Sequence, residues 1–291
     1  MDYTNCKLCP RACGVDRTAG EVGYCRRSAQ LKIARAAPHH WEEPVISGQK
    51  GSGTVFFSGC TLGCAFCQNE PVSHGGLGRE VTDLRRVFES LIDQGVHNIN
   101  LVTPTQFLPH ILPALTPKLP VPVVYNCGGY ESVETLKRLE GLVDIYLPDF
   151  KYSNNILARK LSQAPHYYET ASAAILEMYR QTGPAVIENG IMQRGMILRH
   201  LILPGQIDNS LGVLDWVDEH FRPGQILFSL MSQYVPMGKA REMPGFDRPI
   251  TGEEYDAVLS YMELLGIEDG FLQEFSSASE EYIPDWDFSG L

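Results

Sequence analysis

Residues 59–69 read GCTLGCAFCQN and place three cysteines, Cys60, Cys64 and Cys67, in one loop with the spacing CxxxCxxC. The run TVFFS directly before the loop, residues 54–58, is rich in β-branched and aromatic residues and predicts a buried strand. Three thiolates from one loop can hold three corners of a cubane cluster and leave the fourth iron without a protein ligand. The loop therefore predicts a redox-active [4Fe-4S] cluster whose open iron can bind a substrate or cofactor.

A zinc site is the alternative for the same three cysteines. Structural zinc normally takes four ligands in a closed site, so His74 or Cys127 would have to supply the fourth. The count of three and the position directly after a strand favour the cluster.

Downstream of residue 54, short β-rich runs alternate with amphipathic segments of helical length, the pattern of repeated βα units around a parallel sheet. The six predicted strands are 54–58, 98–102, 121–125, 142–147, 196–203 and 225–231. The predicted helices are 82–94, 132–140, 156–164, 167–181, 211–220 and 252–265, before a last apolar run at 270–273. Six units are too few to close an eight-stranded barrel, so we expect an α/β open partial barrel with ligands at the C-terminal ends of its strands.

Residues 1–50 form a segment of different character, cysteine-rich and with little periodicity. We therefore expect two parts, a small lobe at 1–50 and the partial barrel with a C-terminal extension at 51–291. The lobe carries four cysteines, Cys6, Cys9, Cys13 and Cys25, on a segment too short for a core of its own. Zinc or a second iron–sulfur cluster would hold it together, and the spacing does not separate the two.

The end of this segment gathers His39, His40, Trp41, Glu42 and Glu43. These histidines could be ligands or proton-transfer groups. A solvated turn with one packed aromatic side chain is the other interpretation, because neither metal-ligand spacing nor a partner is evident.

Composition excludes several classes of function. With 24 Lys and Arg against 35 Asp and Glu, the formal net charge of −11 argues against nucleic-acid binding. No apolar run approaches the length of a membrane-spanning helix, so we expect no membrane association. The first residues lack the pattern of a secretory signal, so we expect a cytoplasmic location, where clustered cysteines favour metal or cluster ligation over disulfides.

The cysteine loop, with Phe66 immediately before the last cysteine, resembles that of the radical S-adenosylmethionine (SAM) superfamily. The resemblance implies a partial (β/α)6 TIM-like barrel in which SAM chelates the fourth iron through its amino and carboxylate groups. An electron from the cluster would then break a carbon–sulfur bond of SAM, giving methionine and a 5′-deoxyadenosyl radical that abstracts hydrogen. The cofactors implied are a [4Fe-4S] cluster and SAM.

Over residues 54–240 the chain is similar to pyruvate formate-lyase activating enzymes and their relatives. Three segments carry this likeness: LPDFK at 147–151, LRHLILPG at 198–205 and MGK at 237–239. The first looks like the family's DxK motif and the second like its arginine-bearing fifth strand, which implies that Asp149, Lys151 and Arg199 contact SAM. Basic side chains near strand ends also suit a ligand carboxylate without reference to the family, with surface salt bridging as the alternative.

Two departures from the family pattern bear on the SAM site. Residues 101–105 read LVTPT where many radical SAM proteins have Gly-Gly-Glu-Pro, so backbone carbonyls and Thr103 are expected to accept from the SAM ammonium. Residues 233–235 read QYV where activating enzymes carry a SAM-contacting histidine. Asn126, in NCGGY at 126–130, is expected to be a polar contact of SAM, with a simple turn as the alternative reading of that segment.

The opening CKLCPRACG at 6–14 resembles the activating-enzyme relatives called PflX-type proteins. Three functions stay open at this point. The radical could abstract hydrogen from a glycine or other backbone position of a partner protein, or it could modify a small molecule or side chain, in both cases with a flavodoxin- or ferredoxin-like electron donor. The third is a non-catalytic electron-transfer or iron-sensing protein.

Overall fold

The computed structural model describes residues 2–273 and 284–291, and its centre is a mixed sheet of ten strands. The strand order is β10-β9-β8-β6-β5-β4-β2-β1-β3, with β7 paired to β8. Neighbours from β2 to β10 are parallel, whereas β1 runs antiparallel to β2 and β3, and β7 antiparallel to β8. The strands are β1 (Lys32–His39), β2 (Ser52–Phe57), β3 (Arg79–Glu80), β4 (Ile99–Val102), β5 (Val123–Cys127), β6 (Ile145–Pro148), β7 (Val186–Glu188), β8 (Ile191–Leu201), β9 (Leu227–Met231) and β10 (Gly270–Leu272).

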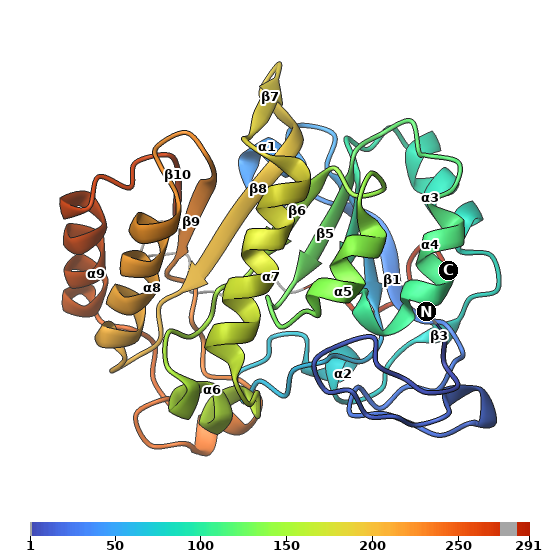
Figure 1. Ribbon diagram of the computed structural model, residues 1–291, viewed down its shortest axis with the longest axis horizontal. Coiled ribbons are helices and arrows are strands. Elements are labelled where there is room, and N and C mark those ends of the chain that lie inside the picture. The colour runs from blue at the N-terminus through green and yellow to red at the C-terminus, as the bar shows by residue number, and fades with distance from the viewer. Residues whose placement is uncertain (1, 274–283) are drawn as a thin grey trace.

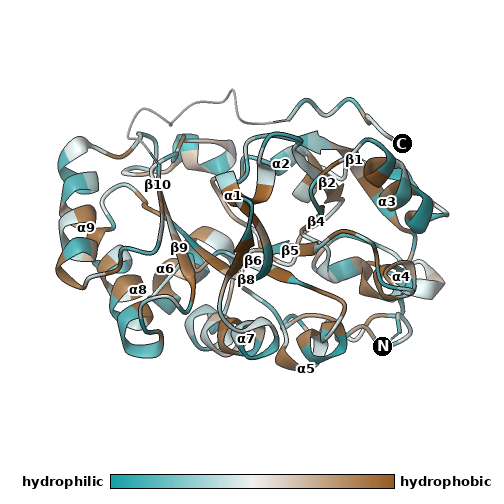
Figure 2. Ribbon diagram, turned by 90° about the horizontal axis from the view of Figure 1, so that it is seen from above, coloured by the Kyte–Doolittle hydropathy of each residue, from teal (hydrophilic) through white to brown (hydrophobic). Residues whose placement is uncertain are grey.

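Most helices connect the parallel strands and lie around one side of the sheet, as the view from above shows (Figure 2). They are α3 (Leu84–Asp93), α4 (Leu108–Ala114), α5 (Val133–Leu136), α6 (Asn155–Ser162), α7 (Tyr167–Thr182), α8 (Ile207–His220) and α9 (Gly252–Leu264). The short helices α1 (Pro44–Ser47) and α2 (Glu70–Ser73) pack on the other face. Capping side chains fix several starts: Asp83 accepts from Arg86 N at α3, and Thr251 forms a capping box with Glu254 at α9.

The central strands are buried along their whole length. All residues of β2, β4, β5 and β6 are buried, as expected for a parallel sheet covered on both faces. The main apolar core includes Phe88 and Ile111 from helices and Tyr125 and Phe228 from strands. This rigid frame places the C-terminal ends of the parallel strands along one edge of the sheet.

The predicted α/β class with a largely parallel sheet is confirmed. All six predicted strands are present, as β2, β4, β5, β6, β8 and β9, and the apolar run at 270–273 contains β10, which extends the parallel run by a strand beyond the expected six. Helix α4 was not predicted because it contains two prolines, Pro109 and Pro113, which disfavour a helix in a sequence pattern. Pro109 sits in its first turn, where proline is tolerated, and Pro113 is near its end.

The N-terminal 50 residues contribute to two regions of the molecule. Residues 2–31 form an irregular segment that lies at the end of the sheet near α2 (Figure 1). Residues 32–39 are β1, which pairs with β2 from Ile33 opposite Phe57 to His39 opposite Ser52. Strand β1 thus belongs to the main sheet, and the division of the chain at residue 50 stays a prediction.

The C-terminal segment, residues 284–291, returns to β1. Ala36 N donates to Ser289 O (2.9 Å), and Arg35 pairs with Asp287 (3.1 Å). Trp286 packs edge-on against Phe56 of β2, with 5.2 Å between ring centroids. The end of the chain therefore lies along the outer side of the antiparallel edge.

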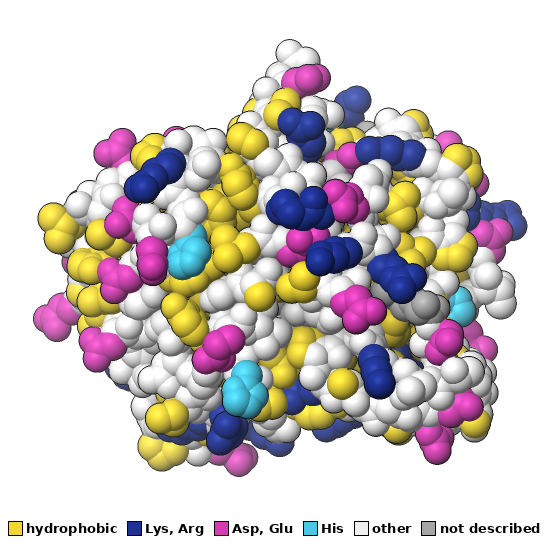
Figure 3. Space-filling model, in the orientation of Figure 1, with side chains coloured by type: hydrophobic (Ala, Val, Ile, Leu, Met, Phe, Trp, Pro, Cys, Tyr) yellow, Lys and Arg dark blue, Asp and Glu magenta, His cyan; other side chains and the backbone are white. Residues whose placement is uncertain are grey.

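The surface seen in Figure 3 mixes acidic and basic side chains rather than gathering one sign over a large area. Among the helices of the described residues, every one is too short or too polar to cross a membrane.

Candidate cofactor site

The three loop cysteines face a cavity of about 250 Å³ at the C-terminal ends of the parallel strands. All five residues predicted to contact SAM line the same cavity: Thr103, Asn126, Asp149, Lys151 and Arg199. They follow or end β4, β5, β6 and β8, so the sheet itself brings together positions that are far apart in sequence. The family resemblance and the positions at strand ends predicted these residues as SAM contacts, and the fold places them on one cavity with the thiols.

Each of the three sulfurs has a hydrogen-bonding neighbour. Leu62 N donates to Cys60 Sγ (3.4 Å), Ser162 Oγ donates to Cys64 Sγ (3.0 Å), and Cys67 Sγ shares a hydrogen bond with Ser73 Oγ (3.1 Å). Such donors stabilise thiolates and tune the potential of a bound cluster.

Burial works against charge on the free thiols. It raises the pKa of Cys67 to about 11 and that of Cys60 further above its ordinary value, with the neighbouring thiols adding to the effect. A metal that binds here must therefore displace the protons, as iron does when it binds thiolate.

Among residues 2–273 and 284–291, no three Cys, His, Asp or Glu side chains surround a position for a single metal ion. A cubane makes a different demand, because its three protein thiolates bind three different irons and need not converge on one point. Three thiols on one cavity wall, each with a hydrogen-bonding neighbour, fit this demand.

Arg199, on β8, is the centre of the polar side of the cavity. Its Nε donates to Asp149 Oδ1 (2.8 Å), its Nη2 to Asn126 Oδ1 (2.8 Å) and its Nη1 to Glu42 Oε2 (3.3 Å). Against the effect of burial, Asp149, Glu43 and Glu42 raise the pKa of Arg199, so the guanidinium stays charged. We call Glu42, Asn126, Asp149, Lys151 and Arg199 the polar ring.

Asp149 and Lys151 form an ion pair within the turn that follows β6. Burial acts to raise the pKa of Asp149, but Arg199 and Lys151 hold it below its ordinary value, so the carboxylate is ionised. Tyr167 of α7 fixes this turn from below: its hydroxyl accepts from Lys151 N (2.9 Å) and lies 2.9 Å from Gly128 O and 3.0 Å from Asp149 O. The resemblance to the DxK motif predicted both residues as SAM contacts, but no sequence signal pointed to Tyr167.

Thr103 lies at the end of β4 in the left-handed backbone region, with φ of 55°. A non-glycine residue there is uncommon and costs on the order of 1–3 kcal/mol, so surrounding contacts must hold it. Thr103 N donates to Asn126 O (2.9 Å), and Gln106 Nε2 donates to Thr103 O (2.8 Å). The same Gln106 amide also donates to Ser58 O and Gly59 O, at 3.0 Å each, and so ties this turn to the start of the cysteine loop.

The segment His39–Glu43 has a mixed outcome. His39 and Trp41 line the cavity together with Glu42, whereas His40 is exposed and does not line it. Burial, with Arg35 and His40 adding to it, lowers the pKa of His39 to about 4, so this imidazole is neutral at pH 7. Sequence reasoning did not assign Glu42 to the ring. Its partners Asn126 and Arg199 lie 84 and 157 positions further along the chain, so only the fold brings them together.

Other residues singled out by sequence lie around this cavity or behind it. Gln233, Tyr234 and Cys127 line it, and Tyr234 also packs against Phe66 with 5.6 Å between ring centroids. His74 instead lines a neighbouring cavity of about 420 Å³ behind the loop, together with Gly238 and Lys239. The turn at 237–239 supports the cysteine loop through the backbone, since Ala240 N donates to Ala65 O (3.0 Å).

The four N-terminal cysteines are grouped in the segment 2–31, outside the main cavity. Cys6 and Cys25 are buried, Cys9 is half-buried and Cys13 is exposed. Burial, with Glu131, Cys25 and Cys13 adding to it, raises the pKa of Cys9 to about 12. Their assignment to zinc or to a second cluster stays a prediction.

Arginine side chains join this segment to the cysteine loop and its neighbours. Arg11 Nε donates to Thr61 O (2.9 Å), Arg26 Nη1 to His74 O (2.9 Å) and Arg17 Nη1 to Gln106 O (2.6 Å). Arg17 is 1% exposed, and its guanidinium lies 4.4 Å from the ring centroid of Tyr3. The N-terminal segment is thus packed directly against the backbone that carries the three cysteines.

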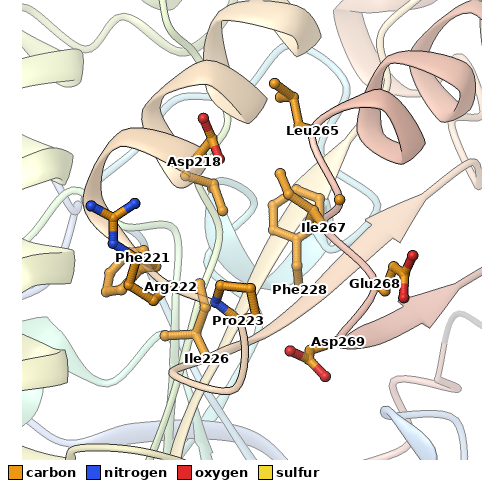
Figure 4. A pocket seen from close by; sticks show the side chains of 12 residues that line it. Asp218, Phe221, Arg222, Pro223, Ile226, Phe228, Leu265, Ile267, Glu268 and Asp269 are labelled. Carbon is orange, nitrogen blue, oxygen red and sulfur yellow. The ribbon is translucent and has the colours of Figure 1, made fainter.

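A further hollow lies between the end of α8, the start of β9 and the segment after α9 (Figure 4). Its volume of about 50 Å³ suits a few water molecules, and Phe221, Ile226, Phe228 and Ile267 supply much of its apolar wall. It is too small for a nucleoside cofactor.

Sequence comparison yields a relative that is longer than this chain. No protein-family model matches the chain. The uncharacterized protein MJ0674 of Methanocaldococcus jannaschii is 29% identical over 279 residues, which cover 91% of this chain and 76% of that protein.

Structural comparison finds a similar fold in larger proteins. SuiB of Streptococcus suis bound to S-adenosylmethionine matches with a TM-score of 0.52 and 13% identity, over 76% of this chain and 50% of SuiB. SuiB bound to its precursor peptide SuiA gives 0.51 and 13%, over 74% and 46%. The FeFe-hydrogenase maturase HydG of Carboxydothermus hydrogenoformans gives 0.50 and 13%, over 79% and 56%. The chain thus spans about half the length of SuiB, and at these identities the likeness establishes the fold.

Proposed function

The chain has the fold of the radical SAM superfamily, and from this premise we propose that it is a [4Fe-4S]-dependent enzyme that cleaves SAM reductively. One observation carries the proposal: the thiols of Cys60, Cys64 and Cys67 share a single cavity with the polar ring. A purely electron-transferring protein would have no need of an ordered set of ligand-binding charges beside its cluster.

The residues divide into two tasks. Cys60, Cys64 and Cys67 would hold the cluster, which supplies one electron to break the SAM carbon–sulfur bond and so yields methionine and a hydrogen-abstracting 5′-deoxyadenosyl radical. Arg199 and Lys151 would neutralise the SAM carboxylate, and Asp149 would accept from ribose hydroxyls. Asn126 and the Thr103 turn add polar contacts on the same wall.

The substrate proposal is a peptide or protein from which hydrogen is abstracted, in the manner of an activating enzyme acting on a glycine. SuiB supports a peptide substrate, since its structure is seen with a precursor peptide. Gln233, in place of an activating-enzyme histidine, supports the alternative of a small molecule or a side chain. A flavodoxin- or ferredoxin-like protein would deliver the electron.

Anaerobic reconstitution tests the proposal. Iron, sulfide and zinc are quantified in the wild type, in the Cys60/Cys64/Cys67→Ala variant and in the Cys6/Cys9/Cys13/Cys25→Ala variant, and 5′-deoxyadenosine is then measured after addition of SAM and dithionite. We expect the wild type to form 5′-deoxyadenosine and the first variant to form none. The second variant identifies the N-terminal metal by the zinc or iron it loses.

Cys127→Ala is the matched control, because Cys127 is a buried cysteine on the same cavity. It should retain the iron that the triple variant loses. Wild-type protein that binds only zinc at the triad, or that carries a cluster and never cleaves SAM, would refute the proposed function.

A further inference from the structure

Glu42 reaches the polar ring from the opposite end of the barrel to the cysteine loop. It follows β1, whose last residue, His39, pairs with Ser52 at the start of β2, whereas the cysteine loop follows the end of β2. Just beyond it, Ile46 of α1 packs into an apolar cluster with Val124, Ile145 and Ile197. Figure 1 shows α1 and α2 at opposite ends of the sheet. The side chain of Glu42 therefore enters from the base and forms part of the cavity floor.

The contacts of Glu42 close a triangle within the ring. Its Oε2 accepts from Arg199 Nη1 and its Oε1 accepts from Asn126 Nδ2, both at 3.3 Å, while Arg199 Nη2 donates to Asn126 Oδ1 (2.8 Å). Asp149 holds Arg199 from another side through Nε (2.8 Å). Two carboxylates thus fix the plane of the guanidinium, and the two bonds of Asn126 fix which way its amide points.

Both side chains of the Glu42–Arg199 ion pair are largely buried. The Glu42 side chain is 10% exposed and that of Arg199 is 14% exposed. A buried carboxylate is costly unless paired, so Glu42 stays in place chiefly because Arg199 is there, and Arg199 is held in turn. Residues 101–105, at the end of β4 and just beyond it, contain no Asp or Glu, so they add no carboxylate to the cavity wall.

We infer that Glu42, which lies outside the βα units of the barrel, is a positioning residue of the SAM site. Its carboxylate, in addition to that of Asp149, orients Arg199 and Asn126 toward the cofactor. The inference rests on the proposed function and adds a residue that neither the cysteine loop nor the DxK turn contains. Its effect acts through Arg199 and Asn126 rather than through contact with the reacting atoms.

The test is the affinity of cluster-loaded protein for SAM, measured by equilibrium dialysis without reductant. We expect Glu42→Ala to weaken SAM binding by about 10- to 100-fold, the range typical when an outer-shell partner is removed. Glu42→Gln should lose less, because its amide oxygen can still accept from Arg199. Should the alanine variant fail to fold, the glutamine variant carries the test, with a measurable loss still expected.

Glu254→Gln is the matched control. Glu254 is also a largely buried carboxylate paired with an arginine, Arg248 (2.7 Å), but it caps α9 away from the cavity. We expect it to leave SAM affinity unchanged. The inference is overturned if the Glu42 variants bind SAM as the wild type does, or if Glu254→Gln weakens binding equally. A wild type that does not bind SAM would instead overturn the proposed function itself.

Discussion

At the scale of single residues, the site depends on polar groups whose partners are backbone atoms. Tyr167 is fully buried, and its hydroxyl joins the turn after β5 to the turn after β6 through Gly128 O, Asp149 O and Lys151 N. Sequence spacing could identify Asp149 and Lys151 because they form a motif. It could not identify Tyr167, since a tyrosine at the start of a helix carries no such signal.

Tyr167→Phe should lower both stability and SAM affinity. Removing the hydroxyl leaves buried backbone groups without a partner, at a cost of about 1–3 kcal/mol in the free energy of unfolding. Urea denaturation and equilibrium dialysis measure the two effects. Tyr146→Phe, which removes a single bond to Gln181 Oε1 (2.7 Å), should cost stability while SAM affinity holds. Equal SAM affinities in Tyr167→Phe and the wild type would count against the positioning role.

Glu131 gives the molecule a predictable dependence on pH. Burial raises its pKa to about 8, although Thr105 and Tyr125 donate to it. The folded state therefore binds a proton that the unfolded state has released between pH 4.5 and about 8. Across that window Glu131 makes the free energy of unfolding fall as pH rises, by at most about 1.4 kcal/mol per pH unit.

Glu131→Gln should remove this dependence, because a neutral amide replaces the protonated carboxyl. The difference in unfolding free energy between variant and wild type, from urea titrations at pH 5 and pH 8, should grow in favour of the variant at pH 8. A difference that is the same at both values would show that Glu131 does not titrate in this range.

At the scale of elements, the central strands that hold the site could be predicted from the sequence, whereas strand β1 near the edge of the sheet could not. Apolar and β-branched residues make up most of strands β2, β4, β5 and β6, whose residues are all buried. Strand β1 reads KIARAAPH, where Lys32, Arg35 and Pro38 interrupt the apolar pattern, as suits a strand near the sheet edge. The ring member Glu42 was missed for a related reason, since only the pairing of β1 with β2 brings its segment beneath the barrel.

Gly129→Ala should disrupt the junction of β5 and β6 more than a matched substitution elsewhere. Gly129 has φ of 76°, and a Cβ there would overlap Asp149 O. Gly95, after α3, has φ of 85°, but a Cβ would meet none of the described atoms within 4 Å. Gly95→Ala should therefore cost only the backbone penalty, about 1–2 kcal/mol.

Calorimetric melting of both variants checks this expectation. Gly129→Ala should be the less stable of the two and should also bind SAM more weakly, because Asp149 must move. Identical melting temperatures would show that the turn has room to adjust.

At the scale of the whole molecule, Arg17 joins the N-terminal segment to the barrel. Its guanidinium donates to Arg27 O (3.0 Å), Ser28 O (2.7 Å) and Gln106 O (2.6 Å), and Gln106 in turn holds the first residues of the cysteine loop. A lysine cannot reproduce this fork of donors.

Arg17→Lys should thus cost about 2 kcal/mol or more in unfolding free energy, because buried carbonyls lose their donors. Arg26→Lys, on an exposed side chain with one bond to His74 O, should stay within about 0.5 kcal/mol. Hydrogen exchange of residues 2–31 and 58–64 measures the coupling directly: both segments should lose protection together in Arg17→Lys. Loss confined to residues 2–31 would separate the two parts.

The last residues of the chain cover part of the outer margin of β1. Ser289 O accepts from Ala36 N, and Asp287 pairs with Arg35, both on β1. Strand β3 pairs only with Lys32 and Ile33 of β1. A strand margin with unpaired amides is a template for another copy to add to. Trimming the protein before Asp285 would bare that margin, and the shortened form would be prone to associate edge to edge.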